Sequence, residues 1–166
     1  MKRNKIAIIN ILMAIVSMFT GCSKFDREVM SDNQEAKQIM EQVIGYLQDG
    51  NADGVKELLS PKTISECKDN IDNQIEEAIT AFSGKKTESY SARCTFSNES
   101  YRDGKLTYYS IRSEAKNIKF DTGEKYSIRI HYHKINKECL EKEGVRSIEL
   151  KINDSNIIYI GKWTGG

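Results

Sequence analysis

The sequence of 166 residues predicts an α+β domain with N-terminal helices packed on one face of an antiparallel sheet of four to five strands. Apolar residues recur at helical spacing between residues 33 and 82, then alternate with polar residues from residue 90 onward. Short Gly-containing turns separate the alternating segments, as in a meander of hairpins. Helices followed by hairpin-linked strands is an order typical of α+β proteins.

The helical part contains three segments, at residues 33–48, 52–59 and 64–82. The first has the clearest apolar stripe, and Gly50 follows its end. The Ser60-Pro61 pair stops the second segment, and Gly84 ends the third. The polar stretch 67–70 is a candidate break inside the third segment.

The strand part contains segments at residues 90–97, 106–118, 126–133, 145–152 and 156–163. Asp103-Gly104 predicts a tight hairpin turn between the first two, and residues 121–124 predict another turn. Residues 136–144 are charged and predict a longer loop. In the third strand Tyr126 and Tyr132 fall on the apolar face, and His131 and His133 fall on the polar face.

Residues 1–21 predict a signal peptide. Lys2, Arg3 and Lys5 precede a 14-residue apolar run, which at 1.5 Å per residue reaches about 21 Å and falls short of the roughly 30 Å hydrocarbon core. Thr20-Gly21-Cys22 resembles a bacterial lipobox, although Phe19 stands where Leu, Val or Ile is usual. We expect a lipid anchor on Cys22, a flexible tether at 22–33 and a single domain at 34–166, held on the extracytoplasmic face of the cell membrane.

The charge of the chain is close to balanced, with 25 basic and 24 acidic residues, which argues against a nucleic-acid-binding protein. The distribution is uneven: residues 23–83 carry a net charge of −7 and residues 84–166 carry +5. The basic half presents a candidate binding face for an anionic ligand, partner or surface, although solvated charges also keep a sheet soluble. Its members are Arg93, Arg112, Arg129, His131 and His133.

The run from Ala36 to Pro61 resembles the opening helices of the nuclear-transport-factor-like (cystatin-like) cone fold. The resemblance rests on a helix, the turn Asp49-Gly50-Asn51, and a short helix that ends in Leu58-Leu59-Ser60-Pro61. It implies a curved sheet, and the whole chain is similar to small bacterial lipoproteins of unknown function. Because that fold hosts enzymes, binding modules and dimerisation units, it leaves the activity open.

In such a cone, an enzyme would hold its acid/base pair in the pocket. The residues expected at that position are Tyr90, Phe96, Tyr126 and Tyr132. No Asp or Glu falls among them in the expected register, so we assign no catalytic residue.

Two imidazoles, those of His131 and His133, share a strand face and are candidates to hold a metal. Further ligands would have to come from the following loop, where Glu138, Cys139, Glu141 and Glu143 are the candidates. Solvated histidines are the simpler interpretation, so we expect no metal or other cofactor. Cys67, Cys94 and Cys139 are odd in number and cannot all pair within the chain.

The leading expectation is therefore a non-enzymatic, membrane-anchored lipoprotein that binds a small ligand or a protein partner. The alternatives are a small-molecule isomerase or dehydratase that uses the cone pocket, and a structural module that forms a homodimer.

Overall fold

The computed structural model describes the backbone of residues 22–162 and the side chains of residues 32–162. The predicted signal peptide lies outside the described residues. The chain divides into two units, residues 1–32 and 33–166. Of the first unit, the described part is the beginning of helix α2, which the structure starts at Cys22 rather than at residue 33. Everything below concerns the second unit.

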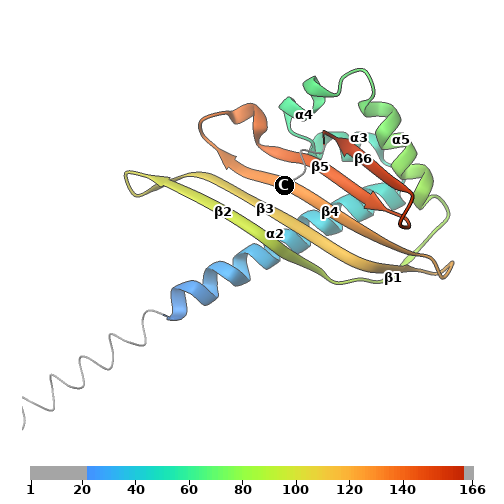
Figure 1. The fold of residues 1–166 in the computed structure, drawn as a ribbon, viewed down its shortest axis with the longest axis horizontal. Coiled ribbons are helices and arrows are strands. Elements are labelled where there is room, and N and C mark those ends of the chain that lie inside the picture. The colour runs from blue at the N-terminus through green and yellow to red at the C-terminus, as the bar shows by residue number, and fades with distance from the viewer. Residues whose placement is uncertain (1–21, 163–166) are drawn as a thin grey trace, which may run out of the picture. The chain divides into compact units, whose positions relative to one another are not determined.

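Within the described residues, four α-helices precede the sheet (Figure 1). Local signals explain their ends: Asn51 accepts a hydrogen bond from the backbone N–H of Gly54 at 2.8 Å, and Ser60 caps the next helix with Pro61 in its first turn. The expected break at residues 67–70 is present, since it separates the last two helices. The helices are α2 (Cys22–Gln48), α3 (Ala52–Leu58), α4 (Pro61–Glu66) and α5 (Ile71–Phe82).

Six antiparallel strands form one open sheet, one strand more than the upper end of the expectation. The extra strand is β1, which precedes the segment expected at 90–97; that segment belongs to β2, and both strands pair with β3. The order across the sheet is β1-β3-β4-β5-β6, with β2 beside β3. The strands are β1 (Thr87–Ser89), β2 (Ala92–Arg102), β3 (Lys105–Phe120), β4 (Lys125–Asn136), β5 (Gly144–Lys151) and β6 (Ile157–Gly161).

The predicted Asp-Gly hairpin is confirmed. Asp103 and Gly104 have φ values of 51° and 72°, the left-handed conformation that a two-residue turn of this type requires. Within the predicted 136–144 loop the structure has a 3₁₀ turn, η1 (Leu140–Lys142), so the helical segments are not all N-terminal. Trp163, expected in the last strand, lies outside the described residues.

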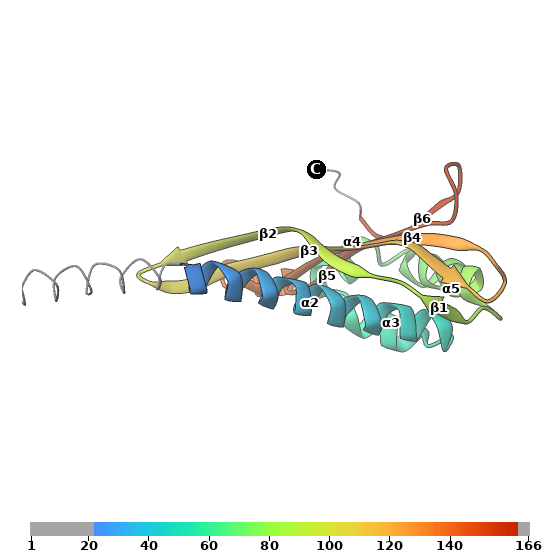
Figure 2. The same cartoon turned by 90° about the horizontal axis from the view of Figure 1, so that it is seen from below.

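The helices cover one face of the sheet, which we call the inner face (Figure 2). Its core joins Val43 and Leu47 of α2 to Ile128 and Ile130 of β4, all at most 1% exposed. At one end of this core the rings of Phe82 and Phe120 meet edge to face, with their centroids 5.3 Å apart. The inner face is thereby filled with packed side chains, and the opposite face remains for interaction with other molecules.

Candidate functional site

The face of the sheet opposite the helices, which we call the outer face, carries the predicted basic residues. Side chains alternate along a strand, so Ile128 and Ile130 of β4 point to the core while Arg129, His131 and His133 point outward. Across the ladder, residues of β3 lie directly opposite and share the same face. Arg112 is paired with His131, and Glu114 is paired with Arg129. The five residues of the predicted binding face are all on this side.

The structure divides this face into two groups with different electrostatics. The first group is centred on Glu114, whose side chain is 9% exposed. Its carboxylate lies 3.2 Å from Arg129, 3.4 Å from Lys116 and 3.7 Å from Arg93, and Arg129 also contacts Glu149 at 3.3 Å. Two of the five predicted residues, Arg93 and Arg129, are therefore paired with a carboxylate within the fold.

The pKa of Glu114 shows the strength of this group. Burial alone would raise it, but the hydrogen bonds and charges of Arg129 and Lys116 hold the pKa below the ordinary carboxyl value. Glu114 is thus an ionised carboxylate that supports the sheet, rather than a proton donor.

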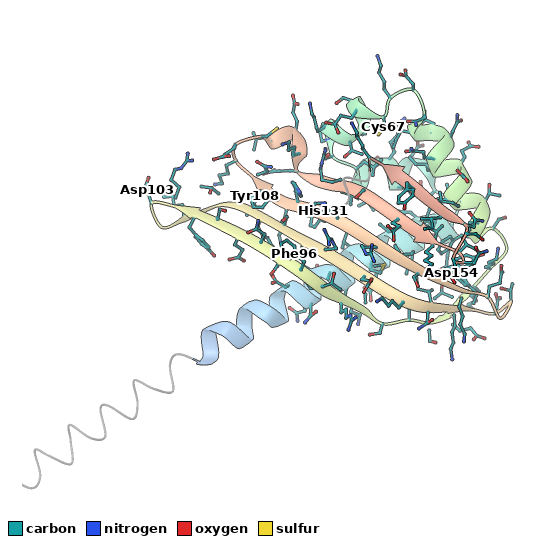
Figure 3. All side chains as sticks on the ribbon, viewed as in Figure 1. Cys67, Phe96, Asp103, Tyr108, His131 and Asp154 are labelled. Atoms are coloured by element: carbon teal, nitrogen blue, oxygen red, sulfur yellow. The ribbon has the colours of Figure 1, made fainter. Side chains whose placement is uncertain are left out.

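The second group, which we call the Arg112 cluster, consists of Arg112, His131, His133 and Tyr108. Within the described chain no carboxylate lies within 4 Å of the Arg112 guanidinium or of either imidazole. The guanidinium instead lies over the ring of Phe96 on the adjacent strand, 5.8 Å from its centroid. Figure 3 labels Phe96, Tyr108 and His131 where β2, β3 and β4 run side by side.

The two histidines of this cluster contact each other. Their ring centroids are 4.9 Å apart at an interplanar angle of 71°, and the Tyr108 ring packs edge-on against His133. The Tyr108 hydroxyl lies 3.5 Å from Nε2 of His133. His133 is 8% exposed although it lies on the outer face. The His133 ring, and with it Nδ1, is therefore held in position by packing against His131 on one side and Tyr108 on the other.

The pKa values of both histidines are lowered. For His131 the causes are burial and then the charges of Arg112 and Arg146. For His133, burial together with His131, Arg146 and Lys142 lowers the pKa to about 4. Both imidazoles are consequently neutral at pH 7, and each offers one hydrogen-bond donor and one acceptor.

Two nitrogens of the Arg112 cluster are buried without a hydrogen-bond partner, Nε of Arg112 and Nδ1 of His133. An unsatisfied buried donor costs roughly 1–3 kcal/mol, so it is unusual in a native fold without a functional reason. If Nε2 of His133 accepts from Tyr108, Nδ1 carries the hydrogen and is a donor, as Nε of Arg112 always is. The cluster therefore holds two buried nitrogens whose hydrogen-bonding capacity is unused.

The four residues expected to line a cone pocket do not come together. Phe96 is 51% exposed and lies on the outer face, contrary to expectation, because a bulge between Cys94 and Phe96 reverses the alternation of β2. Tyr126 is buried in the core, where its hydroxyl contacts the carbonyl of Ala81 at 3.2 Å. Tyr132 is half-buried beside a shallow hollow against α2.

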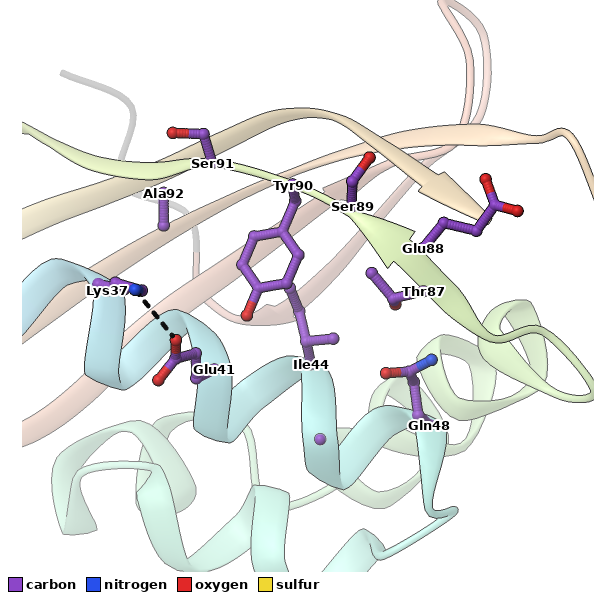
Figure 4. Close-up of a pocket in the computed structure, with 11 residues that line it drawn as sticks. Lys37, Glu41, Ile44, Gln48, Thr87, Glu88, Ser89, Tyr90, Ser91 and Ala92 are labelled. Atoms are coloured by element: carbon purple, nitrogen blue, oxygen red, sulfur yellow. Dashed lines mark ion pairs between the residues drawn. The ribbon is translucent and has the colours of Figure 1, made fainter. Parts of the chain in front are cut away.

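Tyr90 alone of these four enters a larger hollow, a cleft of about 610 Å³ between α2 and the β1–β2 segment (Figure 4). Its ring points from the sheet edge toward Glu41 of α2, and Glu41 forms an ion pair with Lys37 at 3.8 Å. Burial, then the charge of Glu41, raises the pKa of the Tyr90 hydroxyl, so it remains protonated. Gly45 keeps the helix side open, because a Cβ there would meet nothing within 4 Å.

The remaining candidates from the sequence are metal ligands and cysteines. Among residues 32–162, no group of three or more His, Cys, Asp and Glu side chains is arranged to hold a metal ion. Glu143 is used within the fold, where it accepts from the backbone N–H of Asn136. Cys67 and Cys139 are free thiols, and the Cys94 thiol donates to the carbonyl of Phe96 at 3.1 Å. Cys22 begins α2, and its side chain lies outside the described part of the chain.

Two functional groups were missed from the sequence, Tyr108 and Glu114. Both lie in β3, the long strand expected at residues 106–118, where apolar and polar residues do not alternate cleanly. The signal that could have found Glu114 is its position two residues after Arg112, which puts it on the same, otherwise basic, face of the strand. Tyr108 had no such signal, because its contact with His133 depends on the register between β3 and β4.

Comparison with known proteins gives one family. Residues 42–156 match a domain described as a domain of unknown function (DUF5104). No curated protein matches the chain.

Proposed function

Because the chain belongs to this family of domains of unknown function, we propose a role from its own residues: a membrane-anchored extracytoplasmic lipoprotein whose outer face binds an anionic ligand. The ligand-binding group is the Arg112 cluster, with Arg112 as the charged contact and the two histidines and Tyr108 beside it. The role is binding, and no catalytic residue is assigned.

One observation carries the binding proposal. Nε of Arg112 and Nδ1 of His133 are buried nitrogens without a partner, and within the described residues no carboxylate lies within 4 Å of this group; Nδ1 is a donor when Nε2 accepts from Tyr108. Arg93 and Arg129, on the same face, are satisfied by Glu114. An anion at the Arg112 cluster would accept from the unused donors and balance the unpaired guanidinium. The anion would thereby supply the negative charge and the hydrogen-bond acceptors that Glu114 supplies to Arg93 and Arg129.

Phe96 supports a ligand with an apolar part. The exposed ring lies beside the guanidinium and extends the cluster with an aromatic surface. Aromatic rings and Arg are frequent in binding surfaces, because they bury much area at a small entropic cost.

The anchor is supported by the sequence at the N-terminus. Basic residues, an apolar run and Thr20-Gly21-Cys22 follow one another as in lipoprotein signal sequences. In the described residues no helix is long and apolar enough to cross a membrane. We also propose that the open α+β sheet is a cystatin-like cone, on the resemblance of α2, α3 and the turn between them. No observation favours the enzyme or the homodimer alternative specifically.

Binding is tested with sulfate as the probe and the detergent-solubilised full chain, by calorimetry at matched ionic strength. Arg112→Met removes the charge that the cluster depends on and is expected to weaken sulfate binding at least tenfold. Lys125→Met removes one charge from an exposed position near the other end of the sheet and should change binding less than twofold. Equal losses in the two variants would mean that only the diffuse positive charge attracts sulfate, and would refute the site.

The anchor is tested separately by Cys22→Ala. Mass spectrometry of the native protein should show a lipid on the Cys22 peptide, and the variant should leave the membrane fraction. Retention of the variant in the membrane would refute the lipoprotein assignment.

A further inference from the structure

The chain contains two histidines, and both belong to the Arg112 cluster. An anion bound at this cluster would lie beside both imidazoles, so its charge and their protonation must be coupled. This inference rests on the proposed function and asks which class of anion fits.

We propose that the ligand is a doubly charged oxyanion, such as a phosphate monoester, and that it is bound together with one proton taken up by the His131–His133 pair. Within the Arg112 cluster itself the permanent charge is that of Arg112, while Lys142 and Arg146 act on His133 from outside the cluster. A dianion exceeds this charge by one unit, and an imidazolium formed next to it restores the balance.

The charges around the histidines are all positive in the empty site. Arg112 faces them from β3, Arg146 from β5 and Lys142 from η1. The other neighbours are neutral: Tyr108 packs on His133, and Ser147 of β5 lies opposite His131. These cations disfavour a further positive charge, which agrees with the lowered pKa of both imidazoles. A dianion in contact with the same rings reverses the sign of that influence.

Hydrogen bonding is compatible with this proton uptake. An oxyanion without a proton accepts hydrogen bonds and donates none, whereas a neutral imidazole has one nitrogen that can only accept. Protonated His133 would donate from Nδ1 to the ligand and from Nε2 to the Tyr108 oxygen, now 3.5 Å away. Both nitrogens of the buried ring would then be satisfied, as they also would be in the neutral tautomer that accepts from Tyr108, so the balance of charge carries the proton uptake.

Thermodynamic linkage fixes the direction of the pH dependence. If bound sulfate raises the pKa of one histidine, the affinity for sulfate increases as the pH falls from the pKa of the complex to that of the free protein. With one coupled proton, the increase is about tenfold per pH unit within that window.

The test uses the full chain with isotope-labelled histidine, whose two ring signals are followed by NMR from pH 8 to pH 4. Sulfate is the dianionic probe, because it stays fully ionised over this range, and nitrate is the singly charged control. Saturating sulfate should raise at least one histidine pKa by one unit or more, and nitrate should bind more weakly and shift it less. Calorimetry in two buffers of different ionisation enthalpy should count about one proton taken up per sulfate at a pH between the two pKa values.

The possible results separate the two proposals. Sulfate that binds through Arg112 and leaves both pKa values unchanged would overturn the proton coupling and leave the proposed function standing. Nitrate that binds as tightly as sulfate would overturn the dianion. No binding of sulfate at any pH would overturn both. The measurement on the unaltered protein needs no variant, so misfolding of a histidine variant cannot obscure it.

Discussion

Arg112 and Glu114 lie two residues apart on the outer face of β3, and of these two only Glu114 has ion-pair partners among the described residues. Glu114 gathers Arg93, Lys116 and Arg129, while the Arg112 guanidinium lies against Phe96. The basic surface expected from the sequence is therefore one structural ion cluster beside one unsatisfied group. The two groups should respond differently to mutation.

Glu114→Gln should lower the stability of the protein. It leaves three cations on the outer face without their buried carboxylate, and since these cations are partly exposed we expect a loss of about 1–3 kcal/mol in the free energy of unfolding. Urea denaturation at pH 7 measures it. Glu138→Gln is the control, because its pair with Arg102 is exposed on both sides and should be worth less than about 1 kcal/mol. A loss no larger than that of the control would contradict the buried-pair interpretation.

The same carboxylate predicts a pH dependence at acidic pH. The pKa of folded Glu114 is lowered, so its contribution is complete above the ordinary carboxyl pKa of about 4.3 and is lost as the pH falls through the folded value. Glu114→Gln should therefore remove part of the fall in stability below about pH 4. An unchanged difference between the two proteins from pH 7 to pH 3 would show that Glu114 is not held in its charged form.

His133 predicts a second pH dependence, in a different window. Its folded pKa of about 4 is below the ordinary value of 6.5, so the unfolded chain binds the proton more readily and stability falls as the pH drops from about 6.5 to 4. The full effect is at most about 3–4 kcal/mol, at 1.36 kcal/mol for each pKa unit. His133→Gln should flatten the profile in this window. A profile as steep as that of the original protein would assign the effect to other groups.

Gly144→Ala should destabilise the contact between β5 and the start of α4. Gly144 has φ = 115°, and a Cβ on it would lie 2.9 Å from the backbone N of Ser60 and 3.1 Å from the carbonyl of Leu58. Since backbone atoms cannot move aside cheaply, we expect a loss of about 2–4 kcal/mol in thermal or urea unfolding.

Gly45→Ala is the matched control for this prediction. The new methyl group would meet nothing within 4 Å and lies inside α2, so the variant should gain about 0.5–1 kcal/mol from helix propensity. Similar effects of the two substitutions would show that the close approach at Gly144 does not constrain the fold.

Cys67 should react more slowly with a thiol reagent than Cys139. Burial, then the charge of Glu66, raises the pKa of the Cys67 thiol, and the residue is 9% exposed, whereas Cys139 is partly exposed in the loop before η1. Alkylation of the native protein, read by peptide mass spectrometry, should label Cys139 first. Equal rates in the folded protein would indicate frequent local opening around α4 and α5.

The sequence was informative where local chemistry decides the structure. Gly50, the Ser60-Pro61 pair and the Asp103-Gly104 turn each require a particular backbone conformation, so the helix and hairpin boundaries that depend on them were predictable. The α+β class followed from the change of period. Alternation along β4 likewise placed His131 and His133 correctly on one face.

The rest of the site depends on register and bulges, which have no reliable local signal. The bulge in β2 moved Phe96 from the inner to the outer face, where it meets Arg112. A second irregularity in β3, with Asn117 at φ = 55°, determines which residues of β3 lie opposite β4. This register pairs Glu114 with Arg129 and leaves Arg112 opposite His131, an outcome that the sequence alone does not predict.

The region recognised as the family domain is smaller than the structure that holds it together. It begins at residue 42, inside α2, and ends at residue 156, before β6. Ile39 and Met40 on one side and Ile158 and Ile160 on the other are buried in the common core. A gene fragment cut at the family boundaries would thus encode a protein with an open core and a tendency to aggregate. The smallest portable module, for fusion or domain exchange, needs all of α2 from Asn33 onward and the whole of β6.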